Sequence, residues 1–160
     1  MSIQRATEHL KKYGMEGRIL EFSESSATVE MAAEAVGCEA ARIAKTVSFV
    51  AGEDTILIVT AGDAKVDNAG YKRRFGTKAK MLPREEVAPR IGHDVGGVCP
   101  FGVNSGVVVY LDRSLQRFET VFPACGSSNS AIELTIPELE HCSGFADWVD
   151  VCKGWQDTDV

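Results

Sequence analysis

Residues 55–60 read Thr-Ile-Leu-Ile-Val-Thr, a run in which every side chain is apolar or β-branched. A run without polar alternation is typical of a strand that is covered on both faces of a sheet. Residues 107–111 form a second run of this kind. These two segments constrain the fold most, because strands that are buried on both faces need other elements packed on each side of the sheet.

The rest of the chain supplies further strands and the helices that surround them. Strands are predicted at residues 18–22, 45–50, 119–122 and 131–135. Helices are predicted at residues 2–13, 29–36, 39–44 and 84–91, with a further helix or turn from residue 136. Because these strands do not alternate strictly with long helices, we expect an α/β fold with a mixed sheet that is curled or closed into a barrel.

Local signals mark several boundaries of these elements. Thr28 is expected to cap the helix at 29–36, and Gly37 to end it. Asp63 or Asp67 is expected to cap a basic helix that follows. Lys45 is expected at the junction between a helix and a strand. A turn is expected at 23–26, and the polar end of the chain is expected to fray.

Size and composition indicate the class of protein. We expect residues 1–160 to form a single domain, since 17.3 kDa is an ordinary size for one globular domain. We also expect a cytoplasmic location and no membrane partner, because the sequence has neither a long apolar run nor a signal-peptide pattern. The five cysteines, without a C-x-x-C pair, are typical of reduced thiols.

The charge of the chain is unevenly distributed. The net charge is −6, yet residues 65–90 contain eight basic and three acidic residues and so carry +5, which leaves −11 for the rest. This pattern favours one localised anionic partner and does not favour DNA, which needs an extended basic surface. A solvated helix face is the alternative interpretation of the basic segment.

A glycine-rich segment at residues 92–102, which also contains Pro100, is the strongest candidate for a functional loop. Glycines let backbone N–H groups approach a ligand closely, so the segment is suited to hold an oxyanion or another anion. Alternatively, it is a tight connection between two elements. Residues 126–130, Gly-Ser-Ser-Asn-Ser, predict a second polar turn that lines a small pocket.

Individual side chains suggest chemistry as well. The Lys45 ammonium could bind phosphate or polarise a carbonyl at the mouth of a pocket, or it could be an ordinary lysine at a strand edge. A cysteine hydrolase would pair Cys99 or Cys125 with His93 or His141. No clustered ligand motif is present, so we expect no metal and no cofactor.

Six motifs in this order resemble the YbaK/EbsC family, which includes the editing domain of prolyl-tRNA synthetase and its free-standing relatives. They are residues 43–47 (IAKTV), 62–67 (GDAKVD), 92–102 (GHDVGGVCPFG), 110–112 (YLD), 125–126 (CG) and 131–134 (AIEL). The resemblance extends from about residue 27 to about residue 139. The most specific part of it is the functional lysine, at Lys45, followed by a Gly-x-x-x-Pro loop from Gly96 to Pro100.

The resemblance implies a small α/β domain with a central mixed, barrel-like sheet flanked by helices. It also implies hydrolysis of mischarged aminoacyl-tRNA, of the Cys-, Ala- or Ser-tRNA type and chiefly on tRNA(Pro), by positioning and substrate assistance. The partners would be the aminoacylated acceptor end of tRNA and prolyl-tRNA synthetase. A catalytically silent module that binds aminoacyl groups or tRNA is the alternative.

The resemblance implies functional roles for Lys45 and for the loop from Gly96 to Pro100, and the polar turn and the basic segment add further candidates. The catalytic candidates are Lys45, Gly96 and Gly97. The substrate-binding candidates are His93, Val98, Cys99, Pro100, Phe101, Gly102, Asp112, Cys125, Gly126 and Ser127. The RNA-binding candidates are Lys65, Lys72, Arg73 and Arg74. One departure is the sequence Pro123-Ala124-Cys125-Gly126, where cysteinyl-specific members commonly carry a small hydroxyl residue, so alanyl, seryl and other small groups stay open.

Overall fold

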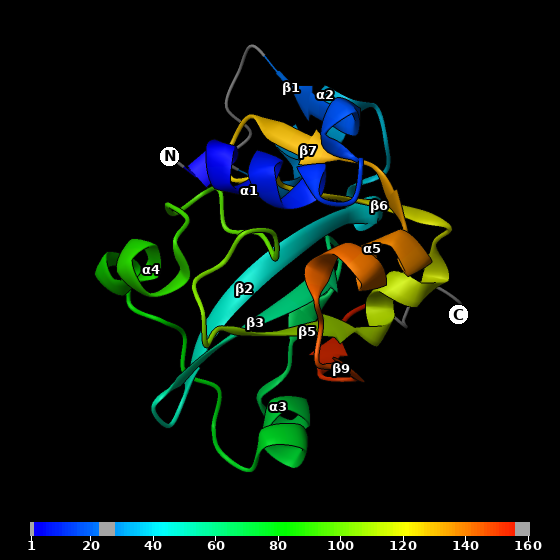
Figure 1. The fold of residues 1–160 in the computed structure, drawn as a ribbon. Coiled ribbons are helices and arrows are strands. Elements are labelled where there is room, and N and C mark those ends of the chain that lie inside the picture. Colours follow the sequence, from blue (N-terminus) through cyan, green and yellow to red (C-terminus); the bar gives the residue numbers. More distant parts are fainter. Residues whose placement is uncertain (1, 23–27, 156–160) are drawn as a thin grey trace.

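The computed structural model describes residues 2–22 and 28–155. Within them, six strands form the main sheet in the order β8-β6-β2-β3-β5-β9, which curls into a half-barrel (Figure 1). The strands are β2 (Ile43–Ala51), β3 (Asp54–Ala61), β5 (Val108–Asp112), β6 (Thr120–Pro123), β8 (Leu134–Thr135) and β9 (Asp147–Val149). The sheet is mixed, because β2–β3 and β6–β8 pair antiparallel and the other neighbours pair parallel. The prediction of a curled, mixed α/β fold is confirmed.

Helices and two small sheets surround the main sheet. The helices are α1 (Ser2–Lys11), α2 (Val29–Val36), α3 (Asn68–Phe75), α4 (Arg84–Ile91) and α5 (Ile136–Ser143). Short 3₁₀ helices are η1 (Glu16–Arg18), η2 (Ala40–Arg42) and η3 (Arg113–Arg117). The small sheets pair β1 (Ile19–Glu21) with β7 (Ser130–Ile132) and β4 (Lys65–Val66) with β10 (Cys152–Lys153). In Figure 1, α1, α2 and β7 lie at one end of the main sheet and α3 lies at the other.

Strand β3 is the centre of the core. The side chains of its four central residues, 56–59, are at most 3% exposed. The sequence predicted this burial on both faces from the absence of polar alternation, and the structure confirms it. None of the helices in the described part of the chain combines the length and apolar character that a membrane crossing requires.

The start of β2 differs from the sequence prediction. The helix expected at 39–44 is only the 3₁₀ turn Ala40–Arg42, and the strand begins at Ile43. Ile43 and Ala44 pair with β6, and this pairing extends the strand backward through Ala44, a residue with a weak preference for strands. The placement of Lys45 at a helix-to-strand junction is therefore wrong, because Lys45 is the third residue of β2.

The predicted caps are present, and some predicted bounds shift. Thr28 accepts a hydrogen bond from the Met31 N–H, and Gly37 ends α2 with φ +76°. Asp67 caps α3, whereas Asp63 pairs with Arg117. The strand predicted at 131–135 is divided into β7 and β8, which pair with different partners, and α1 ends at Lys11 rather than residue 13. The predicted turn at 23–26 and the chain end at 156–160 lie outside the described residues.

Candidate active site

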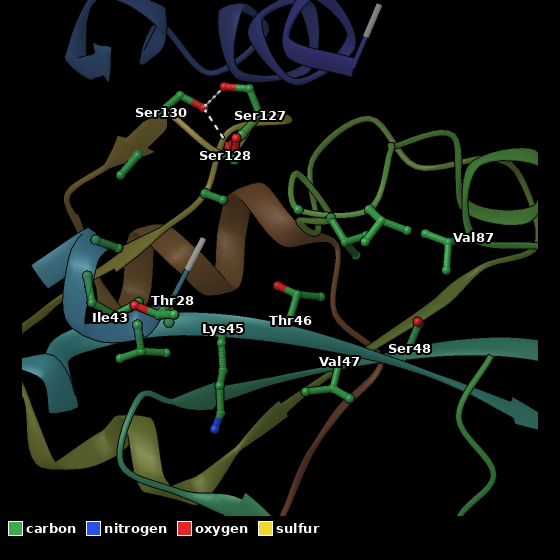
Figure 2. A pocket seen from close by; sticks show the side chains of 18 of the residues that line it. Thr28, Ile43, Lys45, Thr46, Val47, Ser48, Val87, Ser127, Ser128 and Ser130 are labelled. Atoms are coloured by element: carbon green, nitrogen blue, oxygen red, sulfur yellow. Dashed lines mark hydrogen bonds between the residues drawn. The ribbon is translucent and has the colours of Figure 1, made fainter. Parts of the chain in front are cut away.

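A cavity of about 470 Å³ opens beside β2 (Figure 2). Its walls come from α2, from the segment that leads into α4, and from α4 itself. Two further walls are the glycine loop, residues 92–102, and the serine turn, residues 126–130. The volume lies in the range that small-molecule sites occupy in proteins.

Strand β2 presents an unpaired edge to this cavity. Beyond Ala44, β6 no longer pairs with β2, and the next contact on that edge is the bond from the Leu82 N–H to the Ser48 carbonyl (3.1 Å). Alternate residues of a strand direct their backbone groups to the same edge, so Thr46 directs its N–H and C=O to the edge used by Ala44 and Ser48. No residue of the described ranges pairs with these two groups of Thr46.

The side chains of β2 divide between the two faces of the strand. Figure 2 shows Thr46 and Ser48 on one face and Lys45 and Val47 on the other. The Thr46 Oγ1 atom is buried and has no hydrogen-bond partner in the described structure, and Ser48 is 8% exposed. A buried hydroxyl without a partner costs free energy, so Thr46 Oγ1 is suited to bond a ligand inside the cavity.

Lys45 contributes a cation on the opposite face. Its side chain is half-buried, and it forms no hydrogen bond or ion pair with any described residue. Burial lowers the pKa of the Lys45 ammonium from its ordinary value. A partly desolvated ammonium without a counter-ion favours an anionic or carbonyl ligand, because such a ligand restores the interactions lost on burial.

The glycine loop and the serine turn pack directly on each other. A Cβ atom on Gly97 would lie 2.5 Å from the carbonyl carbon and oxygen of Gly126, so only glycine allows this approach. Gly96 has φ +96° and, with Val98, lines the cavity. The Gly97 N–H donates to the Asp94 carbonyl (2.9 Å) within the loop, and Gly97 itself does not line the cavity.

Several predicted substrate-binding residues lie beneath the loop rather than on the cavity wall. His93 Nε2 donates to the Phe101 carbonyl (2.6 Å), and Cys99 Sγ lies 3.5 Å from the same nitrogen. His93, Cys99 and Phe101 are fully buried, and none of them lines the cavity. The Gly102 carbonyl accepts a bond from Arg5 Nε (2.9 Å), and Pro100 is buried beside these residues. Together they support the loop from below.

The structure brings Cys99 and His93 together, as a cysteine hydrolase would require, but it does not activate the thiol. Burial raises the pKa of Cys99 to about 12 and lowers the pKa of His93. Burial also raises the pKa of Cys125. Both thiols are therefore protonated at neutral pH, and a thiolate nucleophile is not favoured. Residues 2–22 and 28–155 contain no disulfide-bonded cysteine.

Asp112 lies away from the cavity wall, whereas the serine turn forms part of that wall. The buried Asp112 carboxylate accepts the Ser114 N–H (2.9 Å) and the Val151 N–H (3.0 Å) away from the cavity wall. Ser127 lines the cavity, and its hydroxyl lies 2.7 Å from Ser130 Oγ. Cys125, which precedes this turn, and Gly126, its first residue, are buried. Asp112 therefore holds backbone, whereas Ser127 is available to shape the cavity.

The four predicted RNA-binding cations lie around α3 and β4. Arg74 pairs with Asp147 (3.1 Å) and covers the rings of Phe75 and Tyr110. Lys65, Lys72 and Arg73 are exposed, and none of these three has an ion-pair partner in the described ranges. None of the four lines the cavity.

Other lining residues were not predicted from the sequence. They include Thr46, Ser48, Met81 and Arg84, together with the face of α2 that carries Val29 and Ala32. The alternation of residues 45–48, Lys-Thr-Val-Ser, is a usable signal, because it places two hydroxyls on one face of a strand. The contribution of α2 depends on packing between distant segments and leaves no local signal.

Comparisons with known proteins agree with this fold. Residues 23–142 match the family model of the aminoacyl-tRNA editing domain. The chain is 53% identical to "Uncharacterized protein YwhH" of Bacillus subtilis (strain 168), over 98% of this chain and 100% of that protein. It is 27% identical to the "Putative Cys-tRNA(Pro)/Cys-tRNA(Cys) deacylase EbsC" of Enterococcus faecalis (strain ATCC 700802 / V583), over 71% of this chain and 70% of that one.

Solved structures give the same result. One described as "a putative trans-editing enzyme for prolyl tRNA synthetase" superimposes with a TM-score of 0.86 at 29% identity, and the match covers 96% of this chain and 98% of that chain. The family model alone spans well over half of the sequence. The chain belongs to the aminoacyl-tRNA editing domain family, which confirms the resemblance to the YbaK/EbsC family that its motifs indicated.

Proposed function

We propose that this protein is a trans-acting deacylase that hydrolyses a small aminoacyl group, alanyl, seryl or cysteinyl, from mischarged tRNA, with tRNA(Pro) as the first candidate. The observation that carries the proposal is the unpaired edge of β2 inside the cavity, where Thr46 offers a hydroxyl, an N–H and a C=O without partners in the described structure. An aminoacyl ester carries an amino group and a carbonyl that complement these groups. The family match and the likeness to the deacylase relative support the same class of reaction.

The size of the cavity supports a ligand limited to the end of the acceptor strand. A volume of about 470 Å³ accommodates a small aminoacyl group and a ribose but not a nucleic-acid helix. The rest of the tRNA therefore stays on the protein surface. Discrimination among alanyl, seryl and cysteinyl groups then depends on the contacts of one small substituent on Cβ, a hydrogen, a hydroxyl or a thiol.

In the proposed reaction, water attacks the ester carbonyl carbon and the bond from that carbon to the ribose oxygen breaks. The ribose oxygen takes up a proton, and the products are the free amino acid and tRNA. The amides of Gly96 and Val98 are candidates to stabilise the oxyanion, and Gly97 allows their loop to approach the serine turn. The Lys45 ammonium orients the terminal nucleotide, and the ribose hydroxyl assists the attack, so no side-chain nucleophile is needed.

The test is deacylation of tRNA(Pro) charged with Cys, Ala, Ser or Pro. We expect release of one small aminoacyl group, and we expect Lys45→Ala to lower the rate about 100-fold or more, the scale of losing a preorganised charged contact. Lys11→Ala, which removes the same charge from α1, should keep the native rate. Circular dichroism of both variants checks that the fold is intact.

Two outcomes would contradict the proposal. Full turnover by Lys45→Ala would exclude the lysine from the mechanism. No release from any of the four substrates, with binding of the charged tRNA retained, would instead support a silent module that binds aminoacyl groups or tRNA.

A further inference from the structure

Met81 is an exposed apolar side chain at the edge of the cavity. It is 64% exposed, the highest value among the large hydrophobic side chains of the described residues, and it lines the cavity. Val95, on the glycine loop, also lines the cavity and is 44% exposed. Exposed apolar side chains that border a cavity commonly mark a surface that a ligand covers.

The position of Met81 relative to β2 follows from strand pairing. Met81 forms an antiparallel bridge with Phe49, and directly paired residues place their side chains on the same face. Phe49 shares its face of β2 with Lys45 and Val47, because side chains alternate along a strand. Met81 therefore lies on the Lys45 face of β2. Figure 2 shows the hydroxyls of Thr46 and Ser48 on the opposite face.

Three cations flank Met81 in the sequence. Lys78, Lys80 and Arg84 are exposed, and none of them has an ion-pair partner within residues 2–22 and 28–155. Arg84 also lines the cavity. By contrast, the neighbouring Arg90 is paired with Glu86 (2.9 Å). The segment Lys78 to Arg84 therefore combines an apolar platform with free positive charge at the cavity mouth.

We propose that this segment docks the single-stranded 3′ end of an RNA, with a base on Met81 and the flanking phosphates on Lys78, Lys80 and Arg84. This inference rests on the proposed deacylase function and deepens it. A nucleobase has an apolar face and is joined to phosphates, so it needs an apolar contact next to cations, as this segment supplies. The free edge of β2 then divides the cavity, with the nucleotide on the face of Lys45 and the aminoacyl group on the face of Thr46.

Binding of a short single-stranded RNA tests the docking segment directly. The probe is a fluorescent, uncharged oligonucleotide that ends in CCA, and its affinity is measured by anisotropy. We expect the double variant Lys80→Ala/Arg84→Ala to weaken binding about tenfold. Lys11→Ala/Lys12→Ala removes the same charge from a region outside the cavity wall and should change the affinity less than about twofold. Equal losses in the two variants would overturn the proposal, since the effect would then be one of net charge.

The apolar platform is tested at Met81 separately. We expect Met81→Ala to weaken oligonucleotide binding about fivefold, because the base loses its contact surface, and Met81→Phe to retain or strengthen it by stacking. Since Met81 is exposed, neither variant should disturb folding. Equal weakening by Ala and Phe would overturn the base contact.

The two proposals fail in different ways. The oligonucleotide carries no ester, so its binding does not depend on hydrolysis. Oligonucleotide binding by this segment without release from any charged tRNA would overturn the deacylase and leave the docking segment in place. Release from charged tRNA with a rate and Michaelis constant unaffected by Lys80→Ala/Arg84→Ala would overturn the docking segment and leave the deacylase.

Discussion

At the scale of single residues, Thr46 is the most informative position in the cavity. Its Oγ1 atom is buried and unpartnered in the described structure, and a buried hydroxyl in this state costs about 1–3 kcal/mol. Valine has the same shape without the hydroxyl and would avoid this cost. A polar group that destabilises the free protein is best explained by a contact with substrate.

We expect Thr46→Val to leave the free energy of unfolding unchanged or raise it by about 1 kcal/mol, while kcat/KM for the charged tRNA falls about tenfold. Urea denaturation and the deacylation assay measure the two effects. Thr60→Val in β3 is the matched control, because the Thr60 hydroxyl is buried and bonds the Ala61 carbonyl away from the cavity. A Thr46→Val variant with native kcat/KM would show that substrate does not use the hydroxyl.

At the scale of elements, the contact between the glycine loop and the serine turn sets the shape of the cavity. The two segments meet where Gly97 faces the Gly126 carbonyl and the Ser127 nitrogen. The loop was predicted from its glycines alone. Its partner could not be predicted, because the contact joins segments that are distant in the sequence and depends on how β6 directs the turn back toward the loop.

We expect Gly97→Ala to separate these segments, since the new Cβ would lie 2.5 Å from backbone atoms that cannot rotate away. Overpacking of this kind costs about 1–3 kcal/mol of stability, and deacylation should fall at least tenfold because the Gly96 amide shifts. Gly17→Ala, whose Cβ would meet nothing within 4 Å, is the control. Thermal unfolding and the deacylation assay measure both effects, and a fully active Gly97→Ala enzyme would contradict this account.

The elements that the sequence predicted are those with strong local signals. Strand β3 has a continuous apolar run, and α2 has both of its caps. Strands β4, β9 and β10 were not predicted, since pairings of two or three residues depend on tertiary contacts and carry no periodicity. In the same way, the motif predicts a functional role for Lys45, but its position within β2 follows only from the start of the strand at Ile43.

At the scale of the whole molecule, the charge distribution limits how RNA binds. The protein carries −6 overall, with +5 on residues 65–90 and −11 on the rest of the chain. An acidic body repels the phosphates of RNA beyond the docking segment. Few phosphates are then contacted, so affinity for the oligonucleotide should depend only moderately on salt.

We expect log Kd for the CCA-ended oligonucleotide to rise with log salt concentration at a slope of about 2, the value for three cations that each displace counterions from single-stranded RNA. In Lys80→Ala/Arg84→Ala the slope should fall to about 0.7. Anisotropy titrations at several salt concentrations measure this slope for the native protein and for the variant. A native slope well above this value would mean that cations outside the docking segment also contact the strand.

The short unpaired edge of β2 has a consequence for solubility. Open strand edges are the usual starting points for edge-to-edge aggregation, because another chain can add to them as a new strand. Here β6 pairs with β2 up to Ala44 and the segment at Leu82 pairs with it from Ser48, so in the described structure the open part of this edge is confined to the residues around Thr46. Such a short stretch cannot template a strand, and it lies beside a cavity. The protein can therefore keep unpaired backbone N–H and C=O groups for a small ligand without exposing them to other chains.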